Sequence, residues 1–229
     1  MNWLTRFLTS SIGQKTVMSL SGLFLITFLL VHLIGNLQLL LPDEGRAFNE
    51  YAEFMTNNPV IKTTSYLLYA SFLLHAIQGF ALWWQNRQAR GTEGYAVKRT
   101  RAVKTNSFAS RYMAALGTII LVFLVLHLYQ FWLQTKLGLL ESVTYDDLEV
   151  GNLYLPIYEV FHNPLFVIFY IFSMIVVGLH LWHGFQSAFQ TLGLNHKKYT
   201  PLIKGMGAVY SIVVPLGFAA IPVYIFLFT

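Results

Sequence analysis

Charged residues are confined to short parts of the chain, and long apolar stretches separate them. Asp, Glu, Lys and Arg are absent from five stretches: 16–42, 63–86, 112–135, 160–196 and 205–229. Each stretch exceeds the roughly 20 residues that a helix needs to cross a ~30 Å hydrocarbon core. The pattern predicts an all-α integral membrane bundle of five transmembrane helices, with spans at approximately 16–41, 62–86, 112–135, 164–190 and 205–228. We expect residues 1–229 to form a single membrane domain.

Helix-start signals and short amphipathic patterns complete the predicted elements. Asn58-Pro59, Asn163-Pro164 and Thr200-Pro201 each place a polar residue before a proline, which favours the first turn of a helix. Residues 2–13 have apolar side chains at helical spacing and predict a short helix lying in the membrane interface. Residues 43–56 have the same spacing, with acidic residues on the opposite face, and predict a second surface helix outside the membrane.

Lys and Arg residues are distributed unevenly between the two sides of the predicted bundle. If the N-terminus is cytoplasmic, the inner segments contain 12 of the 15 Lys and Arg residues and the outer segments contain the other 3. Cytoplasmic loops of membrane proteins carry such an excess. We therefore expect the N-terminus in the cytoplasm and the C-terminus outside. The net charge of +5 then reflects orientation in the lipid bilayer, and it gives no indication of a nucleic-acid partner.

The chain contains no cysteine. Thiolate-bound iron–sulfur clusters, disulfide bonds and thiol catalysis are therefore excluded within this chain. If electrons pass through the protein, they must use another cofactor and enter from another subunit.

Histidines occur inside the predicted spans, where an ionisable residue usually marks a functional site. His32, His75, His127 and His183 lie in four different spans. Counting along the spans places His32 and His127 toward the outside, and His75 with His183 or His180 toward the inside. At 1.5 Å per residue these two layers are separated by roughly 10–20 Å. Two haems, each held between two imidazoles, require this arrangement.

Other interpretations of the histidines explain less of the pattern. A single histidine in a membrane helix often forms a hydrogen bond to a neighbouring helix, but four in two matched layers favour ligands. A closed zinc site needs four converging ligands, which two layers do not provide. Gly35, Gly79 and Gly184 follow the histidines closely. They would leave room for a porphyrin, although small residues also let helices pack.

Three local sequences, together with the five spans, resemble a known family. They are Ser11-Ile12-Gly13-Gln14-Lys15, His32-Leu33-Ile34-Gly35-Asn36 and His180-Leu181-Trp182-His183-Gly184-Phe185-Gln186-Ser187-Ala188-Phe189-Gln190. The chain resembles the dihaem cytochrome b membrane-anchor subunit of bacterial succinate:quinone oxidoreductases (succinate dehydrogenase and fumarate reductase), in which a single five-helix polypeptide carries both haems. The resemblance covers essentially the whole chain.

The resemblance implies two b haems and their ligands. The histidines of the first and third spans, His32 and His127, would hold the outer haem iron, and those of the second and fourth spans the inner one. The family's His-Gly pair aligns with His183-Gly184, so the resemblance implies that His75 pairs with His183, with His180 as the alternative to His183. The family also has a quinone site near the outer haem, where menaquinone is the expected substrate.

Candidate residues for the quinone site and for ligand support follow from this comparison. Glu50 and Glu53 are the candidates for the quinone site, and no catalytic residue is assigned. The second ring nitrogen of each ligand should donate a hydrogen bond to a nearby helix. The side chains considered for this role are Ser19, Ser21, Ser71 and Thr118.

The resemblance also implies partners and a location. A flavoprotein subunit and an iron–sulfur subunit on the cytoplasmic side would oxidise succinate or reduce fumarate, and this chain would exchange their electrons with membrane menaquinone. Such a protein belongs to the respiratory chain and the tricarboxylic acid cycle, and is multi-pass in the bacterial inner (cytoplasmic) membrane, where the complex can form a higher oligomer. Some family members carry a glutamate beside the fourth-span ligand. Leu181 and Trp182 stand there instead, which argues against proton movement by that route.

Two alternatives remain open at this stage. One is the cytochrome b anchor of another quinone-linked oxidoreductase. The other is a haem-free membrane transporter or anchor, a class in which broken helices are common. Pro215 and Pro222 are expected to interrupt the fifth span, but that span contains no histidine or acidic residue.

Overall fold

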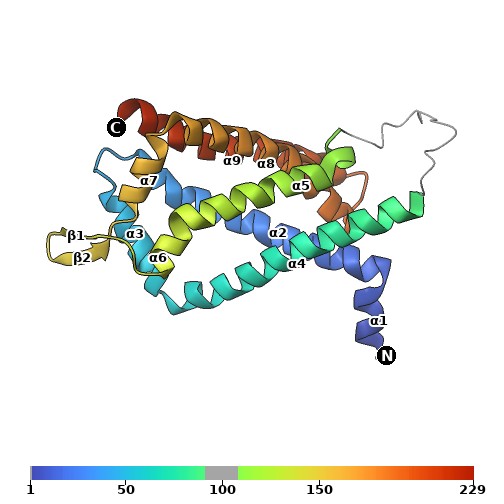
Figure 1. The fold of residues 1–229 in the computed structure, drawn as a ribbon. Helices are drawn as coiled ribbons and strands as arrows, with labels where there is room; N and C mark the ends of the chain where they lie inside the picture. The colour runs from blue at the N-terminus through green and yellow to red at the C-terminus, as the bar shows by residue number, and fades with distance from the viewer. Residues whose placement is uncertain (1, 91–107) are drawn as a thin grey trace.

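Five long helices form the body of the molecule. The computed structural model describes residues 2–90 and 108–229, and within them these helices lie side by side as a bundle (Figure 1). They are α2 (Ser11–Asn36), α4 (Pro59–Arg90), α5 (Phe108–His127), α8 (Pro164–Thr191) and α9 (Thr200–Phe228). Each belongs to a helical segment that is long and apolar enough to cross a membrane. The predicted bundle of five membrane helices is confirmed at this level.

The helices extend beyond the charge-free stretches that predicted them. α2 begins five residues before position 16 and includes Lys15, and α4 begins at Pro59 and continues to Arg90. A charge-free stretch marks only the part of a helix that lies in the hydrocarbon core. The hydrogen-bonded helix itself continues into the membrane interface. Lys and Arg are tolerated there because their long side chains reach water.

The expected surface helix at residues 2–13 is wrong in its extent. α1 (Trp3–Thr9) ends at a corner, and α2 starts directly after Ser10. The Ser10 hydroxyl donates to the Phe7 carbonyl at 2.6 Å and accepts from the Gly13 amide at 3.0 Å. A Cβ atom at position 13 would lie 1.9 Å from the Phe7 oxygen. Only glycine allows this corner, which separates α1 from the membrane helix.

α8 and α9 form the most closely packed pair of helices. Pro215 lacks an amide hydrogen, so it leaves the Ser211 carbonyl without its usual helical partner. A Cβ atom at Gly178 of α8 would lie 2.9 Å from that carbonyl oxygen. Glycine at this contact lets the two backbones approach, as is common between membrane helices. The expectation that Pro215 and Pro222 interrupt the span is wrong, because α9 continues through both.

One end of the bundle carries most of the short elements, and we call it the hairpin end. It contains η1 (Leu37–Leu40), α3 (Arg46–Asn57), η2 (Leu128–Trp132), α6 (Leu133–Lys136), β1 (Ser142–Tyr145), β2 (Leu148–Gly151) and α7 (Tyr154–Phe161). α3 confirms the predicted helix at 43–56. The C-terminus lies at this end and the N-terminus at the opposite one, which we call the α1 end (Figure 1).

The β-hairpin is a departure from the all-α prediction. β1 and β2 are antiparallel, with Tyr145 paired to Leu148, so Asp146 and Asp147 form a two-residue turn. Asp146 has φ of 53°, as tight hairpin turns require, and aspartate tolerates this conformation better than most residues. The polar segment between the third and fourth spans is therefore a folded structure.

Asn49 joins the elements of the hairpin end. Its side chain is 0% exposed. The amide nitrogen donates to the Tyr145 hydroxyl and to Asn152 Oδ1, both at 3.0 Å. The amide oxygen accepts from the Tyr154 backbone at 2.9 Å. One side chain thus connects α3, the hairpin and the start of α7.

Arg46 adds a second link between α3 and the hairpin at the surface. It forms ion pairs with Glu50 at 2.8 Å and Asp146 at 2.6 Å. The hydrogen bond to Asp146, supported by Glu50, raises the pKa of the Arg46 guanidinium above its ordinary value. Arg46 therefore stays charged at any physiological pH, and the link persists.

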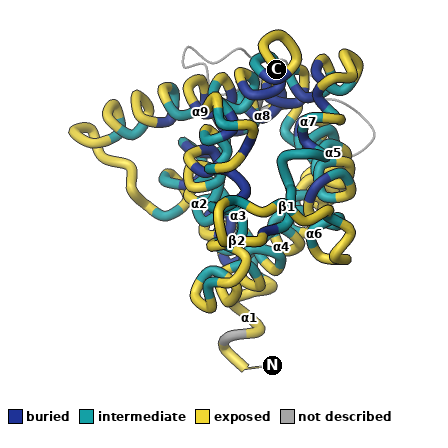
Figure 2. The backbone as a smooth tube through the Cα atoms, turned by 90° about the vertical axis from the view of Figure 1, so that its left-hand side faces the viewer, coloured by how far each residue is buried: buried dark blue, intermediate teal, exposed yellow. Residues whose placement is uncertain are grey.

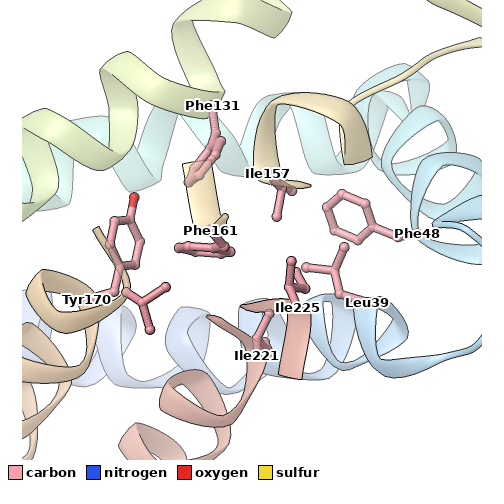
Figure 3. Close-up of a cluster of buried hydrophobic side chains, with 9 residues drawn as sticks. Leu39, Phe48, Phe131, Ile157, Phe161, Tyr170, Ile221 and Ile225 are labelled. Atoms are coloured by element: carbon pink, nitrogen blue, oxygen red, sulfur yellow. The ribbon is translucent and has the colours of Figure 1, made fainter. Parts of the chain in front are cut away.

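The main hydrophobic core also lies at the hairpin end, where side chains of α3, α7, α8, α9 and η2 meet (Figure 3). Its buried members are Leu39, Phe48, Phe131, Ile157, Phe161, Val167, Tyr170, Ile221 and Ile225. The outward faces of the long helices are largely exposed (Figure 2), and lipid would cover them. α4 has no buried residue in 59–89, where its exposure is described, and it is the least buried of the five membrane segments.

Candidate functional site

Two pairs of histidine rings from different helices lie in edge-to-face contact. His32 of α2 and His127 of α5 have ring centroids 5.9 Å apart, with the planes at 86°. His75 of α4 and His180 of α8 have ring centroids 6.3 Å apart, with the planes at 64°. The first pair lies toward the hairpin end and the second toward the α1 end. Each of four membrane helices supplies one ring.

Glycine contacts measure the separation between the two pairs. A Cβ atom at Gly22 would lie 3.2 Å from His75 Cε1, and one at Gly117 would lie 3.9 Å from His180 Cε1. Gly22 precedes His32 by ten residues in α2, and Gly117 precedes His127 by ten residues in α5. At 1.5 Å per residue both helices give an axial separation of about 15 Å.

The fourth-span histidine that meets His75 is His180. The expected His75–His183 pair has no such ring contact within the described part of the chain, whereas the His75–His180 contact is present. His183 lies three residues further along α8, about 4.5 Å closer to the α1 end. The His-Gly motif indicated His183, but the position of α4 brings the other histidine into the layer.

His75 has a hydrogen-bond partner on α2. The Ser21 hydroxyl donates its hydrogen to the Met18 carbonyl at 3.1 Å. Its oxygen lies 3.3 Å from His75 Nδ1 and is therefore available as an acceptor. Ser21 was one of the four side chains considered for this role. Ser19 and Thr118, two of the others, donate to carbonyls of their own helices.

The hairpin-end pair also has partners at Nδ1. His127 Nδ1 lies 3.5 Å from the Tyr170 hydroxyl. His32 Nδ1 lies 3.3 Å from Asn36 Nδ2. A histidine that binds a metal through Nε2 keeps its hydrogen on Nδ1, which then needs an acceptor. Asn36 Nδ2 also donates to the His32 backbone carbonyl at 2.7 Å, so it approaches His32 Nδ1 as a donor and is not such an acceptor.

His180 differs from the other three in having an unsatisfied nitrogen. Its Nδ1 is the one buried side-chain nitrogen or oxygen without a hydrogen-bond partner among the residues that the structure describes. Leaving such a group unpaired costs about 1–3 kcal/mol. Either imidazole nitrogen can bind a metal, so an orphaned nitrogen at this position fits a site that a ligand completes.

The donor set fits haem better than a metal ion held by protein alone. Among the described residues, no three His, Asp or Glu side chains converge as such an ion would require. A porphyrin supplies four nitrogens itself, so two protein ligands suffice. With metal–nitrogen bonds of about 2 Å and each ring centroid roughly 1 Å beyond its nitrogen, two imidazoles on one iron have centroids about 6 Å apart. Both histidine pairs are close to this separation.

The glycines expected beside the cofactors have other neighbours. A Cβ atom at Gly35 would lie 2.4 Å from the Tyr51 ring, so this glycine makes room for α3. Gly79 faces Met18, and Gly184 has open space around it. Gly22 and Gly117, which do face histidine rings, were missed by the sequence analysis. A glycine ten residues before the histidine, in both the first and the third span, was the available signal.

A cavity of about 280 Å³ opens between α4 and α5 near the α1 end. Phe80, Trp83, Arg111 and Thr118 are among its lining residues. Arg111 precedes Gly117 by six residues, so it lies about 9 Å from the His75–His180 layer along the helix. The cavity thus combines aromatic walls with one cation beside that layer.

Glu50 and Glu53, the candidates for a quinone site, lie on α3 at the hairpin end. Glu50 accepts from Arg46 of the same helix, and Glu53 accepts from Asn57. Both carboxylates therefore have partners on the surface of α3. Tyr51 of the same helix packs on the histidine-bearing helix α2 at Gly35.

Comparison of the chain with protein families, with curated proteins and with solved structures finds no match. The residues themselves therefore carry the functional argument.

Proposed function

We propose that the chain is a dihaem cytochrome b membrane anchor that exchanges electrons between a succinate dehydrogenase or fumarate reductase and menaquinone. The observation that carries the proposal is the two facing histidine pairs, from four helices, about 15 Å apart along the bundle. His32 and His127 would hold the haem of the hairpin end. His75 and His180 would hold the haem of the α1 end, with His183 beside it.

Each bound b haem supplies one-electron transfer. The protein's part would be to hold each iron between two imidazoles, which favours electron transfer over oxygen binding. Ser21 and Tyr170 would orient two of the rings. Arg111 would offer a cation to the carboxylates of the haem at the α1 end.

The charge distribution supports an orientation for electron flow. The α1 end bears the excess of Lys and Arg, so we place it in the cytoplasm. The flavoprotein and iron–sulfur subunits would dock there, since this chain has no group that oxidises succinate. The basic loop 87–111 would form part of that docking face or pair with haem propionates; its residues 91–107 lie outside the described residues. Menaquinone would react at the hairpin end, in the bacterial inner membrane.

A haem count on the purified complex tests the proposal. We expect two b haems per chain by pyridine haemochrome, and a reduced-minus-oxidised spectrum of b type. One haem per chain would mean that one histidine layer is not a site. A folded preparation without haem would overturn the proposal and favour a haem-free transporter or anchor.

The enzyme that the anchor serves needs a separate measurement. Succinate added to isolated membranes should reduce the haems, and a flavoprotein subunit should purify with the chain. Haems that another donor reduces, but succinate does not, would assign the chain to a different quinone-linked oxidoreductase.

A further inference from the structure

The third membrane segment changes its helical form directly after His127. α5 ends at this histidine, and the following residues, Leu128–Trp132, form the π-helical turn η2 before α6. A π-turn contains an extra residue in the helix, and such turns often occur at functional sites. The extra residue changes which side chains of the segment face α8.

Two residues of this turn meet Tyr170 of α8: Phe131 through its ring and Gln130 through a hydrogen bond. The Tyr170 hydroxyl of α8 donates to Gln130 Oε1 at 2.7 Å. The same hydroxyl oxygen lies 3.5 Å from His127 Nδ1. A tyrosine hydroxyl has one hydrogen, and here it is given to Gln130. Toward His127 the oxygen can therefore only accept, so a hydrogen bond across this 3.5 Å contact requires His127 to donate from Nδ1.

Tyr170 is held firmly in this position. It is 6% exposed, and its ring packs edge-on against Phe123 and Phe161 at centroid distances of 5.1 and 4.9 Å. Figure 3 shows Tyr170 at the left side of the buried cluster, with its hydroxyl at the upper end of the ring, on the side where Phe131 lies. The hydroxyl thus has a fixed place between the histidine and the glutamine.

We propose that Tyr170 and Gln130 form a directional hydrogen-bond chain from His127 that sets the reduction potential of the hairpin-end haem. This inference rests on the proposed function. The chain fixes the hydrogen of His127 on Nδ1 and leaves Nε2 for iron. A hydrogen bond accepted from Nδ1 makes the imidazole a stronger donor to the metal, which stabilises the oxidised iron. Tyr170 and Gln130 are positioning residues, because neither contacts the iron.

The two haem layers differ in this respect, which gives an internal reference. The partner of His75 is Ser21, whose hydrogen goes to a backbone carbonyl of its own helix. No side-chain amide continues that chain among the described hydrogen bonds. Loss of the Tyr170 hydroxyl should therefore change one haem and leave the other as it was.

Redox titration of the purified complex tests the proposal. Tyr170→Phe removes the acceptor of His127, and Gln130→Met removes the acceptor of Tyr170 while keeping side-chain length. We expect both variants to keep two haems, and both to raise the midpoint potential of the same haem, Tyr170→Phe more strongly. Titrating a His75→Ala variant, which keeps only the hairpin-end haem, identifies which potential that is.

Tyr210→Phe is the matched control. The Tyr210 hydroxyl donates to the Ile26 carbonyl of α2, so the change removes an interhelical tyrosine hydrogen bond in which no histidine takes part. Its two potentials should equal those of the unmodified protein. Unchanged potentials in Tyr170→Phe and Gln130→Met, or equal shifts of both haems, would overturn the inference. A preparation without haem would instead contradict the proposed function.

Discussion

His180 and His183 show what a single residue position contributes to the candidate site. Both lie on α8 within one turn of each other, and the motif containing His183-Gly184 is the more conspicuous in the sequence. Which ring enters the layer depends on where α4 places His75, and that position comes from tertiary packing. Helical spacing alone could therefore not choose between the two.

Replacing each of these histidines separately tests the assignment. His180→Ala should reduce the haem content from two to one per chain, because the ring that faces His75 is lost. His183→Ala should keep both haems, with at most a small shift of the absorption bands. Haem per chain is measured by pyridine haemochrome. The opposite result, loss in His183→Ala alone, would restore the pairing that the sequence motif implied.

Gly22 and Gly117 form a second matched pair at this scale. A methyl group at Gly22 would lie 3.2 Å from the His75 ring, closer than most such contacts, so the ring must move. At Gly117 the corresponding distance to His180 is 3.9 Å, an ordinary contact. Gly22→Ala should lower occupancy of the α1-end haem or shift its absorption band, and Gly117→Ala should change neither. Equal behaviour of the two variants would contradict this geometry.

Among the elements, the long helices and the short helix α3 were predicted, whereas the π-turn and the β-hairpin were not. Five apolar stretches specify five membrane helices, because any other backbone would leave polar groups unpaired in lipid. The π-turn at Leu128–Trp132 has no signal in its sequence, since it depends on how the segment meets α8. The β-hairpin had a signal, because β-branched and aromatic residues flank Asp146-Asp147. The hairpin was not predicted because the segment was interpreted as a polar loop between two spans.

Among the contacts between elements, the hydrogen bonds of Asn49 should contribute most to the stability of the hairpin end. In Asn49→Leu the Tyr154 amide and two further polar groups lose their partner. We expect a loss of about 1–3 kcal/mol in stability of the hairpin end, seen as faster hydrogen–deuterium exchange in residues 142–154. Asn57→Ala, which removes an exposed amide of the same helix, should leave that exchange unchanged. Exchange that is equally slow in both variants would show that the hub is dispensable.

The whole molecule has a predicted orientation that its lack of cysteine makes simple to test. Asp147 is exposed at the hairpin tip, and Lys198 is exposed between α8 and α9 at the other end. In intact cells a membrane-impermeant thiol reagent should label Asp147→Cys and spare Lys198→Cys, because the excess of Lys and Arg places the second site in the cytoplasm. Labelling of Lys198→Cys alone would invert the topology and the direction of electron flow.

At this scale the sequence predicted the bundle and the division of the histidines into two layers. It did not predict that α4, which carries His75, would have no buried residue among its described positions. Hydropathy identifies a membrane helix but does not measure how tightly it packs. Contacts between distant segments decide that, and a cofactor between α4 and α8 would add to them.

The hydrogen bonds of Asn49 also determine when, during synthesis, α3 can join the hairpin and α7. Its partners at Tyr145 and Tyr154 follow it by 96 and 105 residues. At ~5–20 residues per second, a ribosome needs roughly 5–20 s to add them. Throughout that interval α3 is attached through local contacts such as Tyr51 against Gly35. The end of the bundle beside His32 is thus sealed only after the third membrane span has been made and inserted.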